Sequence, residues 1–132
     1  MSIAILGLDG NPMTTRDIDA SPNNYVFSCH KLAFSGNYTT GATGDVLDLT
    51  AIAGLIPSQA LPLSLFAEGN GPSTAWAGLG GYYTISQNAA ALNGYRIRVW
   101  QPGGSELGSG AYPATILADS VTLQILWRKL IG

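Results

Sequence analysis

Charged side chains are scarce in this chain of 132 residues. Lys, Arg, Asp and Glu together make up 11% of the residues, whereas an ordinary globular domain carries roughly 25%. Disorder requires high net charge and low hydrophobicity, but here the net charge is -2 and 46% of the residues are hydrophobic. A solvent-exposed helical bundle would need many Glu and Lys on its outer faces. The sequence therefore indicates a compact domain, part of whose surface contacts another molecule.

Cysteine and histidine occur once each, as the neighbours Cys29 and His30. A single cysteine excludes a disulfide within the chain. Adjacent residues of a strand point to opposite faces, so we do not expect these two side chains to form a catalytic pair. One Cys and one His are also too few for the usual zinc ligand set. We expect neither a metal ion nor a cofactor.

Long apolar runs and basic runs are also missing. No window of about 18 apolar residues predicts a membrane span. Residues 1–8 lack the positively charged segment that begins a secretion signal. A nucleic-acid partner would normally be met by a basic patch, whereas here no basic run exceeds two residues. We expect no membrane partner, no nucleic-acid partner and no secretion signal.

Sequence motifs for hydrolysis or phosphate binding are absent as well. Two carboxylate pairs, Asp17 with Asp19 and Asp45 with Asp48, have the chemistry for glycoside hydrolysis or calcium binding. Neither pair has an aromatic cluster nearby in the sequence, and the spacing of an EF-hand loop is missing. Asp45 is more typical of a turn. We predict that the protein is not an enzyme.

Glycine and proline are abundant, with 17 and 7 residues, and they separate short segments of alternating polarity. This spacing is typical of an all-β fold, a single-domain antiparallel β-sandwich or jelly-roll-like barrel with long Gly-rich loops. Residues 1–24 are expected to form an N-terminal arm and loop, and residues 25–132 the sandwich. Single helical turns are expected near 51–56 and 111–117. Strands are expected at 25–34, 45–49, 61–68, 82–86, 95–100 and 121–130.

The first residues of the arm are apolar, and they suggest an interaction by strand pairing. Ile3, Ile5, Leu6 and Leu8 are suited to add a strand to the sheet edge of a neighbouring subunit. The alternative is that this segment pairs within its own sheet.

A second candidate contact lies in a stretch that is almost free of charge. Between residues 49 and 95 the only charged residue is Glu68, and this stretch contains Trp76, Tyr82 and Tyr83. An exposed tryptophan near tyrosines can bind a protein or a sugar ring. The alternative is that Trp76 folds back onto the sheet and caps the core.

A third candidate contact lies on the strand expected at 95–100. Its alternation places Arg96, Arg98 and Trp100 on one face. These residues predict either a polar outer face with cation–π contacts or a surface between subunits. On the last strand, the alternation places Trp127 in the core.

Three segments carry a pattern known from small structural proteins of tailed bacteriophages. Residues 32–50 read LAFSGNYTTGATGDVLDLT, residues 93–100 read NGYRIRVW, and residues 106–123 contain ELGSGAYP followed by DSVTL. Together they resemble the capsid cement or decoration proteins of phage heads. The pattern does not extend to the segment before Tyr25.

The resemblance implies an all-β protein, frequently trimeric, that binds the major capsid protein at junctions between capsomers. It implies synthesis in the host cytoplasm and a final place on the outer capsid surface of the virion. The expected partners are therefore the major capsid protein and further copies of the chain. The candidate interface residues are Ile3, Ile5, Leu6, Leu8, Trp76, Tyr82, Tyr83, Arg96, Arg98 and Trp100.

The alternative function is recognition at the host surface. A tail or fibre component, or a lectin-like domain, would use Trp76, Tyr82 and Tyr83 to bind a glycan or a protein.

Overall fold

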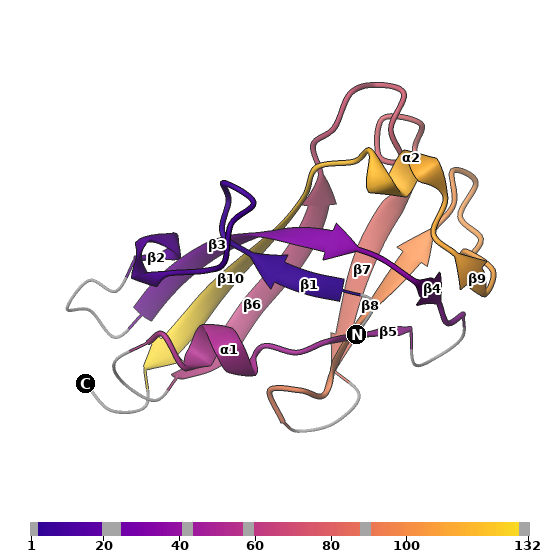
Figure 1. Cartoon of the computed structure of the whole chain (residues 1–132). Coiled ribbons are helices and arrows are strands. Elements are labelled where there is room, and N and C mark those ends of the chain that lie inside the picture. The colour runs from indigo at the N-terminus through magenta and orange to yellow at the C-terminus, as the bar shows by residue number, and fades with distance from the viewer. Residues whose placement is uncertain (1–2, 20–24, 41–43, 57–59, 88–90, 130–132) are drawn as a thin grey trace.

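The chain folds into antiparallel sheets with two short helices, as the computed structural model in Figure 1 shows. The structure describes residues 3–19, 25–40, 44–56, 60–87 and 91–129. Every strand pair in these ranges is antiparallel. The expected all-β, single-domain antiparallel fold is therefore confirmed.

The larger of the sheets, here called the large sheet, has the strand order β1-β3-β10-β6, and β2 also pairs with β3. The last strand, β10, lies in the interior of the sheet, so segments far apart in the sequence are direct neighbours. Its strands are β1 (Ile3–Leu6), β2 (Ile18–Asp19), β3 (Tyr25–Phe34), β6 (Ala60–Gly69) and β10 (Val121–Lys129).

The small sheet has the strand order β5-β8-β7. Its strands β7 and β8 form a hairpin, with Tyr82 opposite Trp100 and Gln87 opposite Tyr95. A further two-stranded ladder joins β4 to β9. The strands are β4 (Asn37–Tyr38), β5 (Asp45–Leu47), β7 (Tyr82–Gln87), β8 (Tyr95–Trp100) and β9 (Gly110–Ala111).

The core lies against the inward faces of these strands. On β10, alternate residues from Val121 to Trp127 are fully buried, and on β8 Ile97 and Val99 are fully buried. Because side chains alternate between the faces of a strand, this pattern gives each strand one core face. The expected core position of Trp127 is confirmed.

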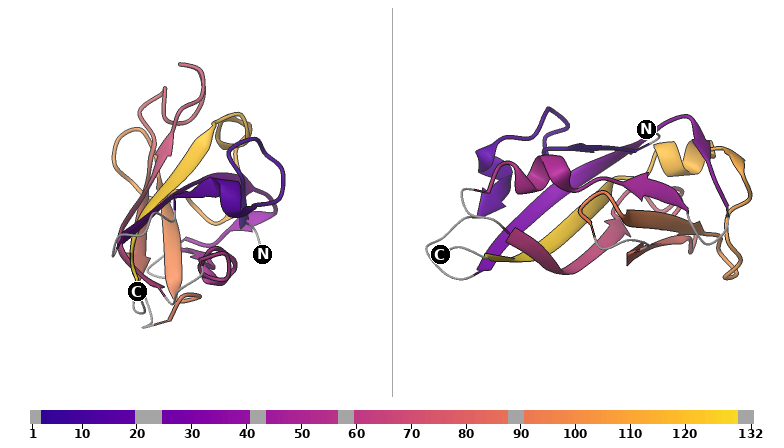
Figure 2. Two further views of the ribbon diagram at one scale, coloured as in Figure 1. Left: turned by 90° about the vertical axis from the view of Figure 1, so that its left-hand side faces the viewer. Right: turned by 90° about the horizontal axis from the view of Figure 1, so that it is seen from below.

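Two helical turns lie well apart in the molecule (Figures 1 and 2). They are α1 (Thr50–Ala53), which overlaps the expected range 51–56 but begins one residue earlier, and α2 (Ala114–Leu117), which lies within the expected range 111–117. Ile52 of α1 and Ile116 of α2 are fully buried, so each turn places one side chain in the core.

The N-terminal segment packs on the sheet of its own chain. β1 pairs with β3, from Ile3 opposite Phe34 to Leu6 opposite Lys31. Within the arm and loop expected for residues 1–24, a 3-10 turn at Thr15–Asp17 precedes β2, so this part of the chain is not a continuous loop. The side chain of Thr14 accepts a hydrogen bond from the backbone of Arg16 and thereby starts this turn. Residues 20–24 lie outside the described part of the chain.

The faces of β3 differ from the pattern expected from its polarity. The sequence predicts a bulge or a strand buried on both sides, but the register with β10 runs without a shift. The core face of β3 includes the polar residues Ser28 and His30, and the aromatic residues Tyr25 and Phe27 point outward. Ser28 is satisfied there, because its hydroxyl oxygen accepts a hydrogen bond of 2.8 Å from the indole N–H of Trp127.

The irregularity lies instead between β6 and β10. The register shifts between Leu126 and Trp127, which pair with Ser64 and Pro62. The shift leaves Leu63 as an extra residue and turns Leu61 outward, opposite Arg128. The sequence pattern placed the alternate residues from Leu61 to Ala67 on one face, and the bulge separates them.

Candidate partner interface

The structure distributes the ten candidate interface residues over three environments. Ile3, Trp76 and Tyr83 are buried in the core of the chain. Ile5 and Leu6 are half-buried on β1, and Leu8 is exposed in the turn that follows. The remaining four lie together on the outer face of the β7–β8 hairpin and are Tyr82, Arg96, Arg98 and Trp100.

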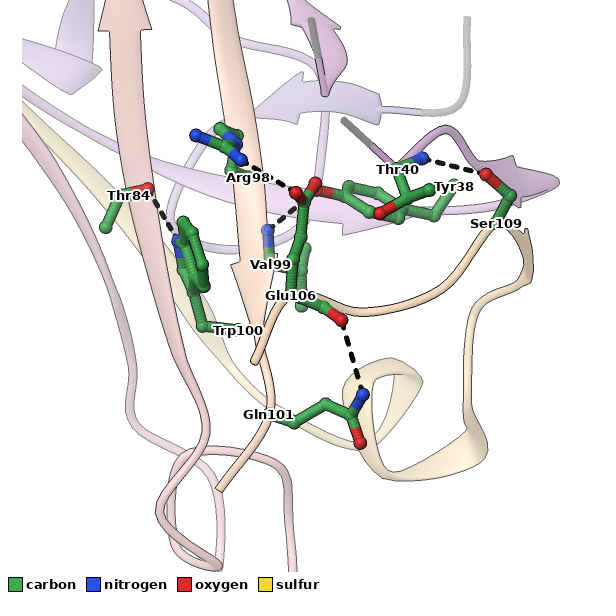
Figure 3. A network of polar contacts seen from close by, with 9 residues as sticks. All are labelled: Tyr38, Thr40, Thr84, Arg98, Val99, Trp100, Gln101, Glu106 and Ser109. Carbon is green, nitrogen blue, oxygen red and sulfur yellow. Dashed lines mark hydrogen bonds and ion pairs between the residues drawn. The ribbon is translucent and has the colours of Figure 1, made fainter. Parts of the chain in front are cut away.

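We call this outer face of the hairpin the Arg–aromatic face. The rings of Tyr82 and Trp100 stack with centroids 6.0 Å apart and planes 12° apart. On the same strand, the guanidinium carbon of Arg98 lies 4.7 Å from the centroid of Trp100. The indole N–H of Trp100 donates a hydrogen bond of 2.8 Å to the hydroxyl of Thr84 (Figure 3). The indole is therefore held from several sides, and its position is restricted.

The position of Arg98 is restricted by an ion pair. Its guanidinium donates to Oε1 of Glu106 at 2.7 Å, and this hydrogen bond raises the pKa of Arg98. The other oxygen, Oε2, accepts a hydrogen bond of 2.6 Å from the phenol of Tyr38. Burial and then the hydrogen bond to Glu106 raise the pKa of Tyr38 to about 12. Figure 3 shows that Glu106 thus links Arg98 of β8 to Tyr38 of β4.

Further hydrogen bonds attach the surrounding loop. The backbone N–H of Thr40 donates to the Ser109 hydroxyl at 2.9 Å, and the Gln101 amide donates to the carbonyl of Glu106 at 3.3 Å (Figure 3). These hydrogen bonds join the loop that carries Glu106 to the residue pair that follows β4 and to the residue that follows β8.

Arg96 is held at the turn of the hairpin. Its guanidinium donates to the carbonyl oxygens of Asn93 at 3.1 Å and of Tyr95 at 3.0 Å. Carbonyl groups do not neutralise its charge. Arg98 beside it is paired with Glu106, so Arg96 is the cation of the Arg–aromatic face that has no carboxylate partner among the described residues.

Trp76 caps the core, which was the alternative left open by the sequence. Its side chain is only 7% exposed, and its backbone N–H donates to the carbonyl of Thr115 at 3.0 Å. Gly81 approaches the indole so closely that an added Cβ would lie 2.3 Å from Nε1. Tyr83 is also buried and donates a hydrogen bond of 2.8 Å to Asp119.

Three tyrosine–carboxylate pairs join segments that are far apart in the sequence. In each pair the phenol donates to a carboxylate more than thirty positions away. Burial raises the pKa of Tyr83 and of Tyr112, and the neighbouring carboxylates raise it further. We call these contacts the tyrosine–carboxylate latches, and they are Tyr38–Glu106, Tyr83–Asp119 and Tyr112–Asp45.

Backbone N–H groups also donate hydrogen bonds to carboxylates in these segments. Asp119 also accepts hydrogen bonds from the N–H groups of Gly71 at 2.9 Å and Ala77 at 3.1 Å. Asp48, the sequence neighbour of Asp45, accepts from the hydroxyl and the backbone N–H of Thr50. These hydrogen bonds lower the pKa of Asp48. Asp45, Glu106 and Asp119 therefore join segments that are distant in the sequence, whereas the hydrogen bonds of Asp48 are local.

A second exposed face was missed by the sequence analysis. On the outer side of the large sheet, five apolar side chains are between 38% and 53% exposed. The sequence does contain a signal for this face. Tyr25 and Phe27 are two positions apart in a strand, so both side chains lie on the same side of β3. We call this set the exposed sheet face, and its members are Tyr25, Phe27, Leu61, Phe66 and Leu126.

Comparison with protein-family models, curated proteins and solved structures found no match to this chain. Within the described ranges, no three His, Cys, Asp or Glu side chains are grouped in a way that could hold a metal ion. The described helices include none with the length and apolar character needed to cross a membrane. The structure thus defines an all-β domain with two exposed sheet faces suited to contact other molecules.

Proposed function

We propose that this protein is a structural virion protein that decorates and stabilises a bacteriophage capsid. It binds the major capsid protein at junctions between capsomers, on the outer capsid surface, after synthesis in the host cytoplasm. The observation that carries this proposal is the position of the latches. The segments that resemble phage head proteins contribute Tyr38, Asp45, Glu106, Tyr112 and Asp119, which hold the loops to the sheets.

Such joints suit a mechanical role. A protein that reinforces a shell must keep its shape under load, and satisfied buried hydrogen bonds between distant segments favour one arrangement of the loops. One latch ties β4 to the loop after β8, and another ties β5 to the segment after β9. Many symmetric copies would then multiply modest contacts with the shell by avidity.

The Arg–aromatic face is the proposed capsid-binding surface. Arg, Trp and Tyr dominate the energetics of protein interfaces. Arg98 and Trp100 are already held in place by Glu106 and Thr84, so binding would lose little side-chain entropy. Arg96, whose charge is not neutralised by a carboxylate of the described residues, lies on the same face as the stacked rings of Tyr82 and Trp100, and it favours a capsid surface that presents a carboxylate beside an apolar centre.

Cosedimentation with purified heads that lack the protein tests this function. We expect the wild-type protein to sediment with the heads at micromolar concentration. Trp100→Ala and Tyr82→Ala should each weaken binding about tenfold or more, as expected for hot-spot residues. Leu79→Ala is the matched control, because Leu79 is exposed on a loop outside the Arg–aromatic face. No sedimentation with heads at this concentration would contradict the proposal.

A second candidate function is recognition of a host-surface glycan by a tail, fibre or lectin-like component. The exposed ring of Tyr82, stacked on Trp100, favours it because a flat aromatic surface can pack against a sugar ring. A glycan array and a measurement of host adsorption with Tyr82→Ala distinguish the two. Glycan binding without capsid binding would support recognition in place of decoration.

A further inference from the structure

We propose that His30 is an acid-operated release for the N-terminal segment, residues 3–19, which detaches from β3 more often as the pH falls. His30 lies on the core face of β3 and is fully buried. Neither of its ring nitrogens has a hydrogen-bond partner among the described residues. A buried imidazole of this kind favours the neutral form, because a charge without a partner in the core is strongly destabilising.

The N-terminal segment meets β3 in two ladders, one on each side of His30. β1 pairs with β3 as far as Leu6, which is opposite Lys31, and β2 begins with Ile18 opposite Ser28 (Figure 1). Both ladders lie along the edge of β3 that faces away from β10. His30 therefore lies where the pairing along this edge is interrupted.

Two isoleucines of the segment cover the core beside His30. Ile5 is opposite Leu32, two positions after His30, and it packs against the core. Ile18 is opposite Ser28, two positions before His30, and it is buried. Side chains two positions apart on a strand share a face, so both isoleucines flank the imidazole on the core face. Detachment of the segment removes them and opens this part of the core to water.

Opening at this edge costs less free energy than opening of the whole sheet. β1 and β2 are strands of four and two residues, and they pair only with β3 in the described sheet. β10, on the other side of β3, is a strand of nine residues with a partner on each side. Short edge elements open locally at lower free energy than central strands. Detachment of the N-terminal segment is therefore the route by which His30 reaches water.

One carboxylate acts on His30, and it belongs to the same segment. A Cβ added to Gly7, the residue that follows β1, would lie 2.9 Å from an oxygen of Asp17. The Asp17 carboxylate accepts a hydrogen bond of 2.9 Å from the backbone N–H of Thr14 but none from His30. Its charge raises the pKa of His30, but burial has the larger effect and lowers this pKa to about 4.

The other charged groups on β3 and on the elements packed against it do not face His30. Arg16 of the 3-10 turn pairs with Asp9 at 3.5 Å, and Lys129 lies beyond the last pair between β10 and β3. Five titratable residues occupy register positions of the outer face, and they are Tyr25, Cys29, Lys31, Asp19 and Arg128. β1 and α2 contain no charged residue. Asp17 is therefore the charge that opposes the effect of burial.

The direction of the pH effect follows from proton uptake. While the segment is in place the pKa of His30 is about 4, and after detachment it returns to its ordinary value of 6.5. Below pH 6.5 the detached state therefore binds a proton that the closed state does not, so falling pH favours detachment. From pH 7 to pH 5 the detached fraction should rise about thirtyfold.

The release connects the two roles that the sequence left open for this segment. In the closed state, β1 is a strand of its own sheet. In the detached state, Ile3, Ile5 and Leu6 belong to a free apolar arm, and the edge of β3 is unpaired. These are the two parts that strand exchange between copies requires.

Amide hydrogen exchange measures the release. The protection factor of the hydrogen-bonded amides of β1, which is the intrinsic exchange rate at each pH divided by the measured rate, should fall about thirtyfold from pH 7 to pH 5. Amides of β10 should be better protected at both pH values. Urea at about 1 M should accelerate exchange in β10 more than in β1, because detachment exposes less surface than global unfolding.

Two variants assign the effect to one side chain. His30→Leu removes the titrating group and should abolish the fall in protection at β1. Asp17→Asn keeps an oxygen that can accept the hydrogen bond from Thr14 but cannot titrate. The fall should stay about thirtyfold in this control, and any change in protection should be the same at both pH values.

Three outcomes would overturn the proposal. They are a protection factor of β1 that does not change between pH 7 and pH 5, a thirtyfold fall that persists in His30→Leu, and equal protection of β1 and β10. Loss of the fall in Asp17→Asn would assign the effect to Asp17 and would also overturn it. None of these results bears on capsid binding, which the cosedimentation experiment measures separately.

Discussion

Tyr38 and Glu106 are 68 positions apart in the sequence and are joined by a hydrogen bond of 2.6 Å from phenol to carboxylate. The same phenol oxygen accepts a hydrogen bond of 3.1 Å from the backbone N–H of Val99. One side chain thus connects β4, the edge of β8 and the loop that follows β8. Arg98 binds the other oxygen of Glu106, so the joint extends to the Arg–aromatic face.

Tyr38→Phe removes the hydroxyl group that forms both hydrogen bonds, to Glu106 and to Val99, and keeps the aromatic ring. We expect the free energy of unfolding to fall by about 1–3 kcal/mol, since a buried N–H of Val99 loses its acceptor. Urea denaturation measures the change. Tyr25→Phe is the control, because Tyr25 is exposed and its loss of a hydroxyl should change stability by less than about 0.5 kcal/mol. Equal effects of the two substitutions would contradict the structural role of Tyr38.

Gly81→Ala tests the packing of Trp76. The added methyl would lie 2.3 Å from the indole Nε1, which is far inside van der Waals contact. We expect a loss of about 1–3 kcal/mol from overpacking and a change in tryptophan fluorescence. Gly108→Ala is the matched control, because nothing lies within 4 Å of its added methyl. The measurement is the melting temperature of both variants in thermal unfolding. An unchanged melting temperature for Gly81→Ala would refute the close contact between Gly81 and the Trp76 indole.

His30 makes stability depend on pH. Burial lowers its pKa from 6.5 to about 4, against a smaller opposing effect of Asp17. Between these values the unfolded chain takes up a proton that the folded chain does not, so stability falls as the pH is lowered. The expected loss from pH 7 to pH 5 is about 2 kcal/mol. Urea unfolding at pH 5, 6 and 7 measures it.

The control for this pH effect is His30→Leu. His30 is the only histidine of the sequence, so no other side chain has an ordinary pKa near 6.5. Stability of the Leu variant should be nearly constant between pH 7 and pH 5. A slope equal to that of the wild type would show that His30 is not the titrating group.

Ser28 and Trp127 should be energetically coupled. The indole N–H donates to the Ser28 hydroxyl at 2.8 Å, and both residues are fully buried. Ser28→Ala should cost about 1–3 kcal/mol, because it leaves the N–H of Trp127 unpaired. In a double-mutant cycle, Ser28→Ala combined with Trp127→Phe should cost less than the sum of the single changes, by about 0.5–2 kcal/mol. Additive costs would show that the hydrogen bond contributes nothing.

The long strands could be predicted from the sequence because their periodicity is clear. β8 and β10 alternate strictly between buried and outward residues, and Gly and Pro mark the turns between strands. The two-residue strands β2, β4 and β9 were missed. A strand of two residues has no period, and its partner is decided by tertiary contacts.

The exposed sheet face was missed for a different reason. Ser28 and His30 point into the core while Tyr25 and Phe27 point out, which reverses the usual relation between polarity and burial. The inward place of Ser28 follows from the indole N–H of Trp127, a contact across 99 positions that no local pattern contains. On β7–β8 the alternation did predict that Arg96, Arg98 and Trp100 share a face, and the hairpin register added Tyr82 to them.

The place of β10 in the large sheet has a consequence for synthesis on the ribosome. β10 pairs with β3 on one side and with β6 on the other. Neither β3 nor β6 can complete its hydrogen bonds in the sheet before residues 121–129 have been synthesised. Contacts across such long sequence separations form slowly and leave apolar strand edges uncovered in the meantime. The large sheet is therefore expected to close only after β10 has emerged from the ribosome, and until then the uncovered strand edges make the nascent chain a suitable client for a chaperone.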